Sequence, residues 1–171
     1  ERNTVEHFNC FTGLTPGYAA TVRLNRFRHQ GPAVDGACVH VHIGPQNGVI
    51  IEQNWAHDAS VKAFRFDRVN SPTAAWGTNG TLRQNVWWRT GAAFIKGNNH
   101  TVTNNTGFAS SDDATGALTV MMFDPAKPWS KKGENHDTRL YNNAADSIFN
   151  VSGVLPATPA TRGNNVGDTD I

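Results

Sequence analysis

Short β-prone stretches that end in asparagine recur along the chain and dominate its pattern of hydrophobic and polar positions. Most of them alternate apolar and polar residues, often follow Gly or Asn, and precede a small or aromatic residue. The six stretches are residues 4–9, 21–25, 49–54, 81–85, 101–105 and 138–142. Unequal intervals separate their terminal asparagines, which argues against a helical repeat of fixed length.

Repeated short strands with connections of variable length predict an all-β fold, specifically a parallel β-helix. In that architecture the strands stack by parallel pairing, side chains alternate between core and surface, and loops extend without disturbing the stack. Asparagine at a corner accepts left-handed backbone geometry, and its amide can bond to the equivalent amide one level away. A ladder of asparagines is therefore expected. An antiparallel β-sandwich rich in Asn-Gly turns is the alternative.

The length of 171 residues fits one domain. Residues 1–153 are expected to form the stacked strands, with an insertion at 124–135 whose prolines and lysines indicate a surface loop. Residues 154–171 lack periodicity and are expected to be an irregular tail or linker. The strand-like start near Thr4 favours a segment of a longer helix, since repeat proteins need capped ends.

Charge and cysteine content limit the possible partners. Charged residues make up 17% of the chain and the net charge is +1, so nucleic-acid binding is not expected. No run approaches the roughly 20 apolar residues of a membrane span, and we expect a secreted protein without a membrane partner. Cys10 and Cys38 fit either one disulfide or two buried thiols. N-glycosylation patterns begin at Asn79, Asn99, Asn104 and Asn150, although such triplets also arise by chance in an Asn- and Thr-rich chain.

Residues 47–58, continuing to 64–67, resemble the rungs of right-handed parallel β-helix repeat proteins. They are similar to the pectate-lyase-like superfamily, which includes polysaccharide lyases, glycoside hydrolases, alginate epimerases and phage tailspikes. The resemblance covers roughly residues 4–150. It implies the fold and polysaccharide as the partner rather than one reaction. A divalent cation such as calcium is the candidate cofactor.

Alignment of the rungs on their asparagines predicts which side chains stack, at a spacing of about 4.8 Å. The third residue after each asparagine is His57, Trp88, Phe108 and then Ala145, and the next is Asp58, Arg89, Ala109 and then Asp146. Aromatic faces stack on sugar rings and charged groups fix hydroxyls or uronates. Trp88, Arg89 and Phe108 are therefore predicted to bind substrate. Trp129, in the 124–135 loop, either overhangs such a groove or packs the loop onto the helix.

Two further strands supply polar candidates. Alternation in residues 39–43 turns His40 and His42 to one face, and alternation in residues 64–67 turns Arg65 and Asp67 outward together. If His40 and His42 converge with His57 and Asp58, the cluster is suited to a divalent metal or to a general base with an orienting carboxylate. Ordinary exposure on a polar surface is the simpler interpretation of all four.

Catalysis can be assigned in two ways from these residues. A lyase would use His57 as the base and Lys62, Arg65 or Arg89 to neutralise a uronate. A hydrolase would need two carboxylates, for which Asp58 and Asp67 are the best pair and Asp146 is a third candidate.

Three classes of function follow from the sequence. The first is an extracellular polysaccharide lyase, hydrolase or epimerase with His57, Asp58, Arg65 and Asp67 as its catalytic residues. The second is a non-catalytic subunit of a fibre or surface layer, which self-associates through open helix ends. The third is an adhesin or spike that binds glycan without cleaving it.

Overall fold

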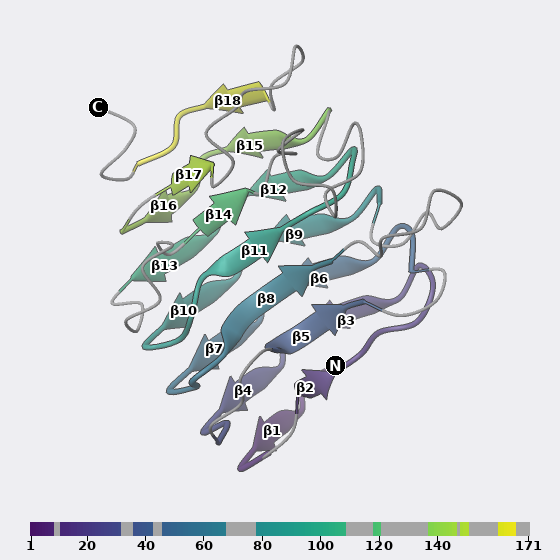
Figure 1. The fold of residues 1–171 in the computed structure, drawn as a ribbon, viewed down its shortest axis with the longest axis vertical. Helices are drawn as coiled ribbons and strands as arrows, with labels where there is room; N and C mark the ends of the chain where they lie inside the picture. Colours follow the sequence, from purple (N-terminus) through teal and green to yellow (C-terminus); the bar gives the residue numbers. More distant parts are fainter. Residues whose placement is uncertain are drawn as a thin grey trace, which may run out of the picture.

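The computed structural model describes residues 1–8, 11–31, 36–42, 46–67, 78–108, 118–120, 137–146, 148–150 and 161–166, with the backbone alone at 118–120, 149–150 and 161–162. Regular structure in these ranges consists of β-strands that form three six-stranded sheets (Figure 1). Every strand pair in them is parallel. The all-β prediction is confirmed, and the antiparallel sandwich is excluded. No helix in the described ranges is long and apolar enough to cross a membrane.

The chain visits the three sheets in a fixed order, so each strand pairs with the strand three places along. Sheet A contains β1 (Thr4–Glu6), β4 (Arg26–Arg28), β7 (Trp55–His57), β10 (Val86–Trp88), β13 (Thr106–Phe108) and β16 (Ala144–Ala145). Sheet B contains β2 (Thr12–Leu14), β5 (Ala37–Val41), β8 (Lys62–Phe66), β11 (Ala93–Ile95), β14 (Leu118–Val120) and β17 (Ile148–Asn150). Sheet C contains β3 (Thr21–Arg23), β6 (Ile50–Glu52), β9 (Thr81–Arg83), β12 (Thr101–Thr103), β15 (Arg139–Tyr141) and β18 (Thr161–Gly163).

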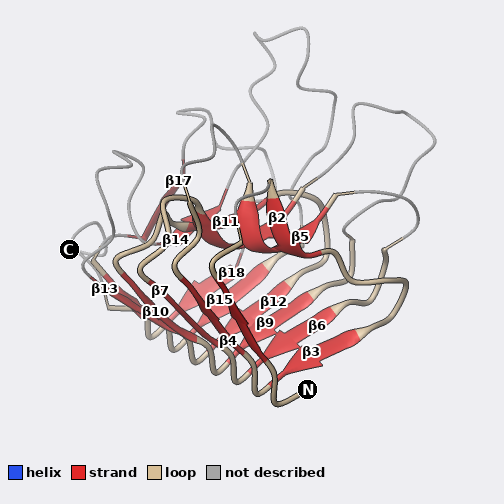
Figure 2. Ribbon diagram, turned by 90° about the horizontal axis from the view of Figure 1, so that it is seen from below, coloured by secondary structure: helices blue, strands red, loops and turns tan. Residues whose placement is uncertain are grey.

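The core lies between the three sheets, which form three sides in Figure 2. Because side chains alternate along a strand, the central residue of a three-residue strand in sheet A or C points inward. In sheet A these residues are Phe27, Ala56, Trp87 and Gly107, and in sheet C they are Val22, Ile51, Leu82, Val102 and Leu140. Sheet B adds Val39, Val41, Phe64, Phe66 and Ile95. The phenylalanines of β8 therefore lie in the core, as the sequence predicts.

Each pass of the chain through sheets A, B and C forms one level of the stack. At the corner between sheets C and A, a buried ladder of asparagines joins successive levels. At each step an asparagine donates its backbone N–H and its Nδ2 to Oδ1 of the next asparagine, for example from Asn54 to Asn85 at 2.9 and 3.1 Å. Nδ2 also donates to a core-strand carbonyl of the level before, as Asn85 does to Ile51 at 2.9 Å. Among the described residues the ladder consists of Asn3, Asn25, Asn54, Asn85, Asn105, Asn143 and Asn165. The predicted ladder is confirmed for its four middle members, Asn25, Asn54, Asn85 and Asn105.

Left-handed backbone geometry lies one residue before each ladder asparagine, not at the asparagine as the sequence suggested. The residues with positive φ at this corner are Arg2, Leu24, Gln53, Gln84, Asn104, Asn142 and Asn164. The corner between sheets A and B repeats the geometry at His7, His29, Asp58 and Arg89. The backbone requires the conformation at these corners, whatever residue occupies them.

The predicted alignment of the strands is wrong at both ends of the stack. Residues 4–6 pair with the strand that follows Asn25, so Asn3 begins the described ladder; Asn9 lies outside the described residues. Near the other end Arg139 pairs with Thr101, which puts Asn143 in the ladder in place of Asn142. Strand β18 pairs with β15, Asn165 extends the ladder and Val166 bridges Ala144, so residues 161–166, which were expected in the irregular tail, continue the stacked strands.

Of the two cysteines, Cys38 is a free thiol in the core, and its burial raises its pKa to about 12. The structure thus has the buried thiol at this position; Cys10 lies outside the described residues. The insertion at 124–135, with Trp129, also lies outside them.

Candidate functional site

The outer face of sheet A carries two columns of side chains that flank the inward central residues. The first column is Arg26, Trp55, Val86 and Thr106, and the second is Glu6, Arg28, His57, Trp88 and Phe108. Because the strands pair in parallel register, the members of each column lie directly above one another on successive strands. The sequence prediction that His57, Trp88 and Phe108 stack is confirmed, whereas the one-residue shift near Asn143 puts Asp146, and not Ala145, next in this column.

Aromatic rings of the two columns contact one another over three levels. The imidazole of His57 lies 4.5 Å from the Trp88 ring at an interplanar angle of 4°, and Trp88 lies 5.9 Å from Phe108 at 10°. Trp55 joins from the first column, at 4.7 Å from Trp88. Trp55 is 42% exposed and Phe108 is 45% exposed. The sheet therefore presents a continuous apolar surface to solvent, and parallel pairing fixes its geometry.

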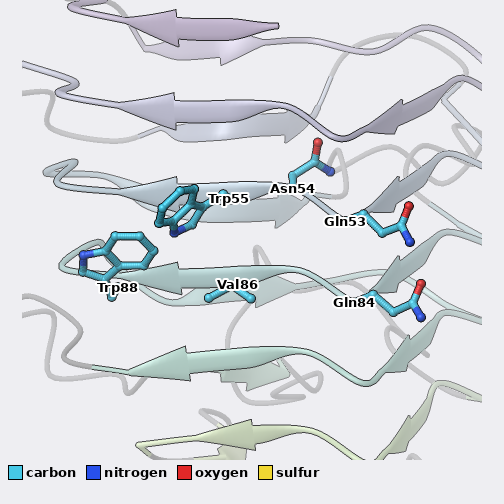
Figure 3. Close-up of a pocket in the computed structure, with 6 residues that line it drawn as sticks. All are labelled: Gln53, Asn54, Trp55, Gln84, Val86 and Trp88. Carbon is cyan, nitrogen blue, oxygen red and sulfur yellow. The ribbon is translucent and has the colours of Figure 1, made fainter. Parts of the chain in front are cut away.

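An open pocket of about 460 Å³ lies beside these rings. It is lined by Gln53, Asn54, Trp55, Gln84, Val86 and Trp88 (Figure 3). The two glutamines occupy the left-handed corner position on neighbouring levels, so their amides lie beside the aromatic columns. The pocket thus combines apolar faces with hydrogen-bonding amides at one border.

His57 is held at both ring nitrogens. Its Nδ1 is 2.5 Å from Oδ2 of Asp58, and its Nε2 accepts a hydrogen bond of 2.9 Å from Nε of Arg26. Because Arg26 can only donate, Nε2 carries no proton and the proton lies on Nδ1, toward Asp58. His57 is also only 3% exposed. In this arrangement neither nitrogen is open to accept a proton from a substrate.

Asp58 is paired with Arg89 as well as with His57. The guanidinium contacts both carboxylate oxygens, through Nε to Oδ1 and through Nη2 to Oδ2 at 2.9 Å. The hydrogen bond from Arg89, supported by that from His57, holds the pKa of Asp58 well below its usual range. Arg89 also lies over Trp88, at 6.0 Å from the ring centroid. Asp58 is therefore ionised and holds side chains of the aromatic surface in place. An ionised carboxylate does not suit the role of a proton donor.

A second polar cluster lies on the outer face of sheet B around Asp67. Arg65 Nη2 is 2.6 Å from Asp67 Oδ2, Lys96 Nζ is 2.8 Å from Oδ1, and His40 Nε2 is 3.4 Å from Oδ2. Although burial alone would raise the pKa of Asp67, the hydrogen bond from His40 and the charges of Lys96 and Arg65 hold it well below its ordinary value. This carboxylate also stays ionised.

The two histidines of this cluster are engaged by protein groups. His40 is buried, its Nδ1 is 3.2 Å from the Thr12 hydroxyl, and its ring stacks on His42 at 3.9 Å. Burial lowers the pKa of His40, and the hydrogen bond to Asp67 opposes this effect only in part. With both nitrogens of His40 in contact with side chains, the pair does not present a ready metal site. Binding of a divalent metal by His40 and His42 remains a prediction, as does the calcium cofactor.

The predicted catalytic residues do not converge. His57 and Asp58 belong to the sheet A face, whereas Arg65, Asp67, His40 and His42 belong to sheet B. Arg65 and Asp67 do point outward together, as the sequence predicts, but they are largely buried. Asp58 and Asp67 each have their own cationic partners, so they are not arranged as an acid and a base around one bond.

Sequence reasoning missed the first column of sheet A, with Arg26, Trp55 and Val86, and the two glutamines of the pocket. The sequence contains a pattern that identifies this column, because Arg26, Trp55 and Val86 each follow a ladder asparagine by one residue. Reading the alignment at that offset, in addition to the third residue, would have identified both outward columns, since the residue between points inward.

Comparisons of the chain with protein-family models, with curated proteins and with solved structures gave no match.

Proposed function

We propose that the chain is part of a right-handed parallel β-helix and that it binds polysaccharide on the outer face of sheet A. Support for the coil comes from the order of the strands, which repeats sheet A, sheet B and sheet C along the chain. Its right-handedness follows from the general rule that parallel crossover connections are right-handed. The resemblance to the pectate-lyase-like superfamily is part of this proposal.

The observation that carries the proposed binding is the exposed aromatic surface of Trp55, Trp88 and Phe108 beside the open pocket. Sugar rings present apolar C–H faces and polar edges. Flat aromatic faces stack on the former, and amides or guanidinium groups bind the latter. Here Gln53 and Gln84 line the pocket and Arg26 lies over Trp55 at 4.9 Å. The proposed ligand is an extended extracellular glycan, and the protein is proposed to be secreted.

The geometry favours binding over cleavage. His57 has both nitrogens occupied, and the pKa values of Asp58 and Asp67 are lowered, so each carboxylate is a poor general acid. A hydrolase needs one protonated and one ionised carboxylate at one bond. Neither the lyase nor the hydrolase assignment is therefore retained as the leading proposal.

A panel of acidic and neutral polysaccharides, titrated into the purified chain by calorimetry, tests the proposal. We expect one class to bind, and Trp55→Ala and Trp88→Ala each to weaken it by about tenfold, because each removes a large apolar contact. Tyr18→Ala is the matched control, since Tyr18 is an exposed aromatic outside sheet A. The proposal is overturned if no polysaccharide binds, or if both tryptophan variants bind like the parent.

The same mixtures, followed for new reducing ends and unsaturated products with and without calcium, separate binding from cleavage. We expect no product. A product that disappears in His57→Ala would replace the binding proposal with the enzymatic one.

A further inference from the structure

Three potential metal ligands meet at the corner between sheets A and B. Glu6 ends β1, His7 follows it, and His29 follows β4 one level along. One ligand atom from each of the three lies within 4.8 Å of the others, and all three residues are exposed. The imidazoles of His7 and His29 lie 5.0 Å apart with their planes tilted by 33°.

Register explains why the three residues meet. Glu6 pairs with Arg28 across β1 and β4. The residues that follow them, His7 and His29, therefore lie side by side on adjacent levels. Both histidines have left-handed backbone geometry, with φ of 54° at each. Because the same corner geometry repeats on adjacent levels, the two side chains leave the backbone in the same direction. Two imidazoles can therefore approach one ion together.

The ligand atoms of this cluster are accessible. Within the part of the chain that the structure describes, neither His7 nor His29 forms a side-chain hydrogen bond or ion pair. This contrasts with His40 and His57, whose nitrogens are engaged. Glu6 is bound by Arg28, but both contacts are made to Oε2. Its Oε1 is thus the oxygen that remains for a cation.

We propose that Glu6, His7 and His29 bind a divalent transition-metal ion, with Zn²⁺ as the representative ion. Two imidazole nitrogens and one carboxylate oxygen are a common ligand set for zinc, whereas calcium prefers six or more oxygens. Three protein ligands leave further coordination positions to water. The site is separate from the pocket beside Trp55 and Trp88, and it does not depend on polysaccharide binding.

Zinc chloride titrated into the tag-free chain by calorimetry is the direct test. We expect one ion per chain and no competition from calcium. His7→Asn and His29→Asn should each weaken zinc binding by at least about tenfold, since even the loss of residues that orient metal ligands costs 10–100-fold in affinity. Asparagine is chosen because it tolerates the left-handed backbone at both positions.

Two further variants make the outcome specific. Arg28→Gln should tighten zinc binding, because it frees Oε2 of Glu6, whereas Glu6→Gln should weaken it. Leu24→Asn is the control for asparagine at an exposed left-handed corner away from the cluster, and it should bind zinc like the parent. Absence of zinc binding in the parent, or unchanged binding in a folded His7→Asn/His29→Asn double variant, overturns the proposal.

Discussion

The imidazole of His57 lies flat against the indole of Trp88, with ring centroids 4.5 Å apart and planes 4° apart. His57 is buried and held by Asp58 and Arg26, so it is a fixed support for a ring that is more exposed. The value of His57 to a ligand is therefore indirect, through the position of Trp88.

This relationship predicts different outcomes for two substitutions of His57. His57→Ala should weaken polysaccharide binding by about 2- to 12-fold, the equivalent of the 0.5–1.5 kcal/mol typical of an aromatic pair. His57→Phe keeps a flat ring against Trp88 and should bind within about twofold of the parent. Calorimetric titration of the same glycan measures both. Equal weakening in the two variants would show that the hydrogen bonds of the imidazole to Arg26 and Asp58, and not its flat ring, hold Trp88 in position.

The asparagine ladder predicts a large loss of stability for Asn85→Ala. Oδ1 of Asn85 accepts from the backbone N–H and Nδ2 of Asn54, and its Nδ2 donates to Asn105 and to the Ile51 carbonyl. Removing the amide leaves several buried groups without partners, at about 1–3 kcal/mol each. We expect the free energy of unfolding to fall by about 3–5 kcal/mol, measured in urea. Gln84→Asn, one residue earlier on the exposed side, should not lower it, because asparagine tolerates the left-handed backbone at that position.

The all-β architecture of parallel strands was predictable because its determinants are local and repeated. A buried ladder needs asparagine at each position, since this side chain accepts from the level before and donates both to that level and to the level after, and the repeated asparagine is visible in sequence. The alignment near the last predicted stretch was wrong because a local pattern does not distinguish two adjacent asparagines. Asn142 and Asn143 are adjacent, as are Asn104 and Asn105, and only pairing decides which member is buried and which adopts the left-handed conformation.

The candidate site was predictable in part. Stacking of His57, Trp88 and Phe108 follows from alignment on the ladder. In parallel register, residues at the same distance in sequence after each ladder asparagine lie above one another. The relation of Asp58 to Asp67 does not follow from alignment, since the two residues lie on different sheets and each is surrounded by its own cations. The pairing of Glu6 with His7 and His29 was also missed, because it depends on the true register of the first strand.

Backbone geometry predicts that Leu24→Asn stabilises the protein. Leu24 has φ of 57° and is 39% exposed, and the left-handed conformation costs an ordinary side chain about 1–2 kcal/mol. Asparagine tolerates this conformation and occupies the equivalent corner at Asn104 and Asn142. We expect a gain of about 0.5–1 kcal/mol in the free energy of unfolding. Leu14→Asn is the control, because Leu14 is similarly exposed but lies in a strand; an equal gain there would point to reduced hydrophobicity and not to the backbone.

Close packing predicts a penalty for Gly107→Ala. A Cβ at Gly107 would lie 2.2 Å from Cε2 of the fully buried Trp87, so the indole or the strand has to move. Over-packing of this kind typically costs about 1–3 kcal/mol. Gly17→Ala, where a Cβ would meet nothing within 4 Å, should be neutral or slightly stabilising. If the cost arises from the indole, Trp87→Phe should recover part of it in the Gly107→Ala background, and an additive loss would exclude that cause.

The cluster around His40 predicts loss of stability in acid in two stages. Burial lowers the pKa of His40 in the folded protein, so the unfolded chain takes up this proton first as the pH falls. The contribution of His40 is therefore complete above its unfolded pKa of about 6.5 and is lost as the pH falls below that value. Asp67 has a folded pKa well below its unfolded one of about 3.9, so its contribution is complete above that pH and is lost as the pH falls further.

The first stage can be assigned to His40 by substitution. His40→Gln removes the titrating group and retains a polar side chain that can hydrogen-bond in place of the imidazole. Urea unfolding at pH 7.5 and 5.5 should show that the parent loses stability over this interval and that the variant loses less. The two proteins differ only at residue 40, so the difference between the two slopes is assigned to His40 and its contacts with His42 and Asp67. Identical slopes would mean that the buried imidazole takes up its proton as readily in the folded protein as in the unfolded chain, which contradicts the burial-lowered pKa.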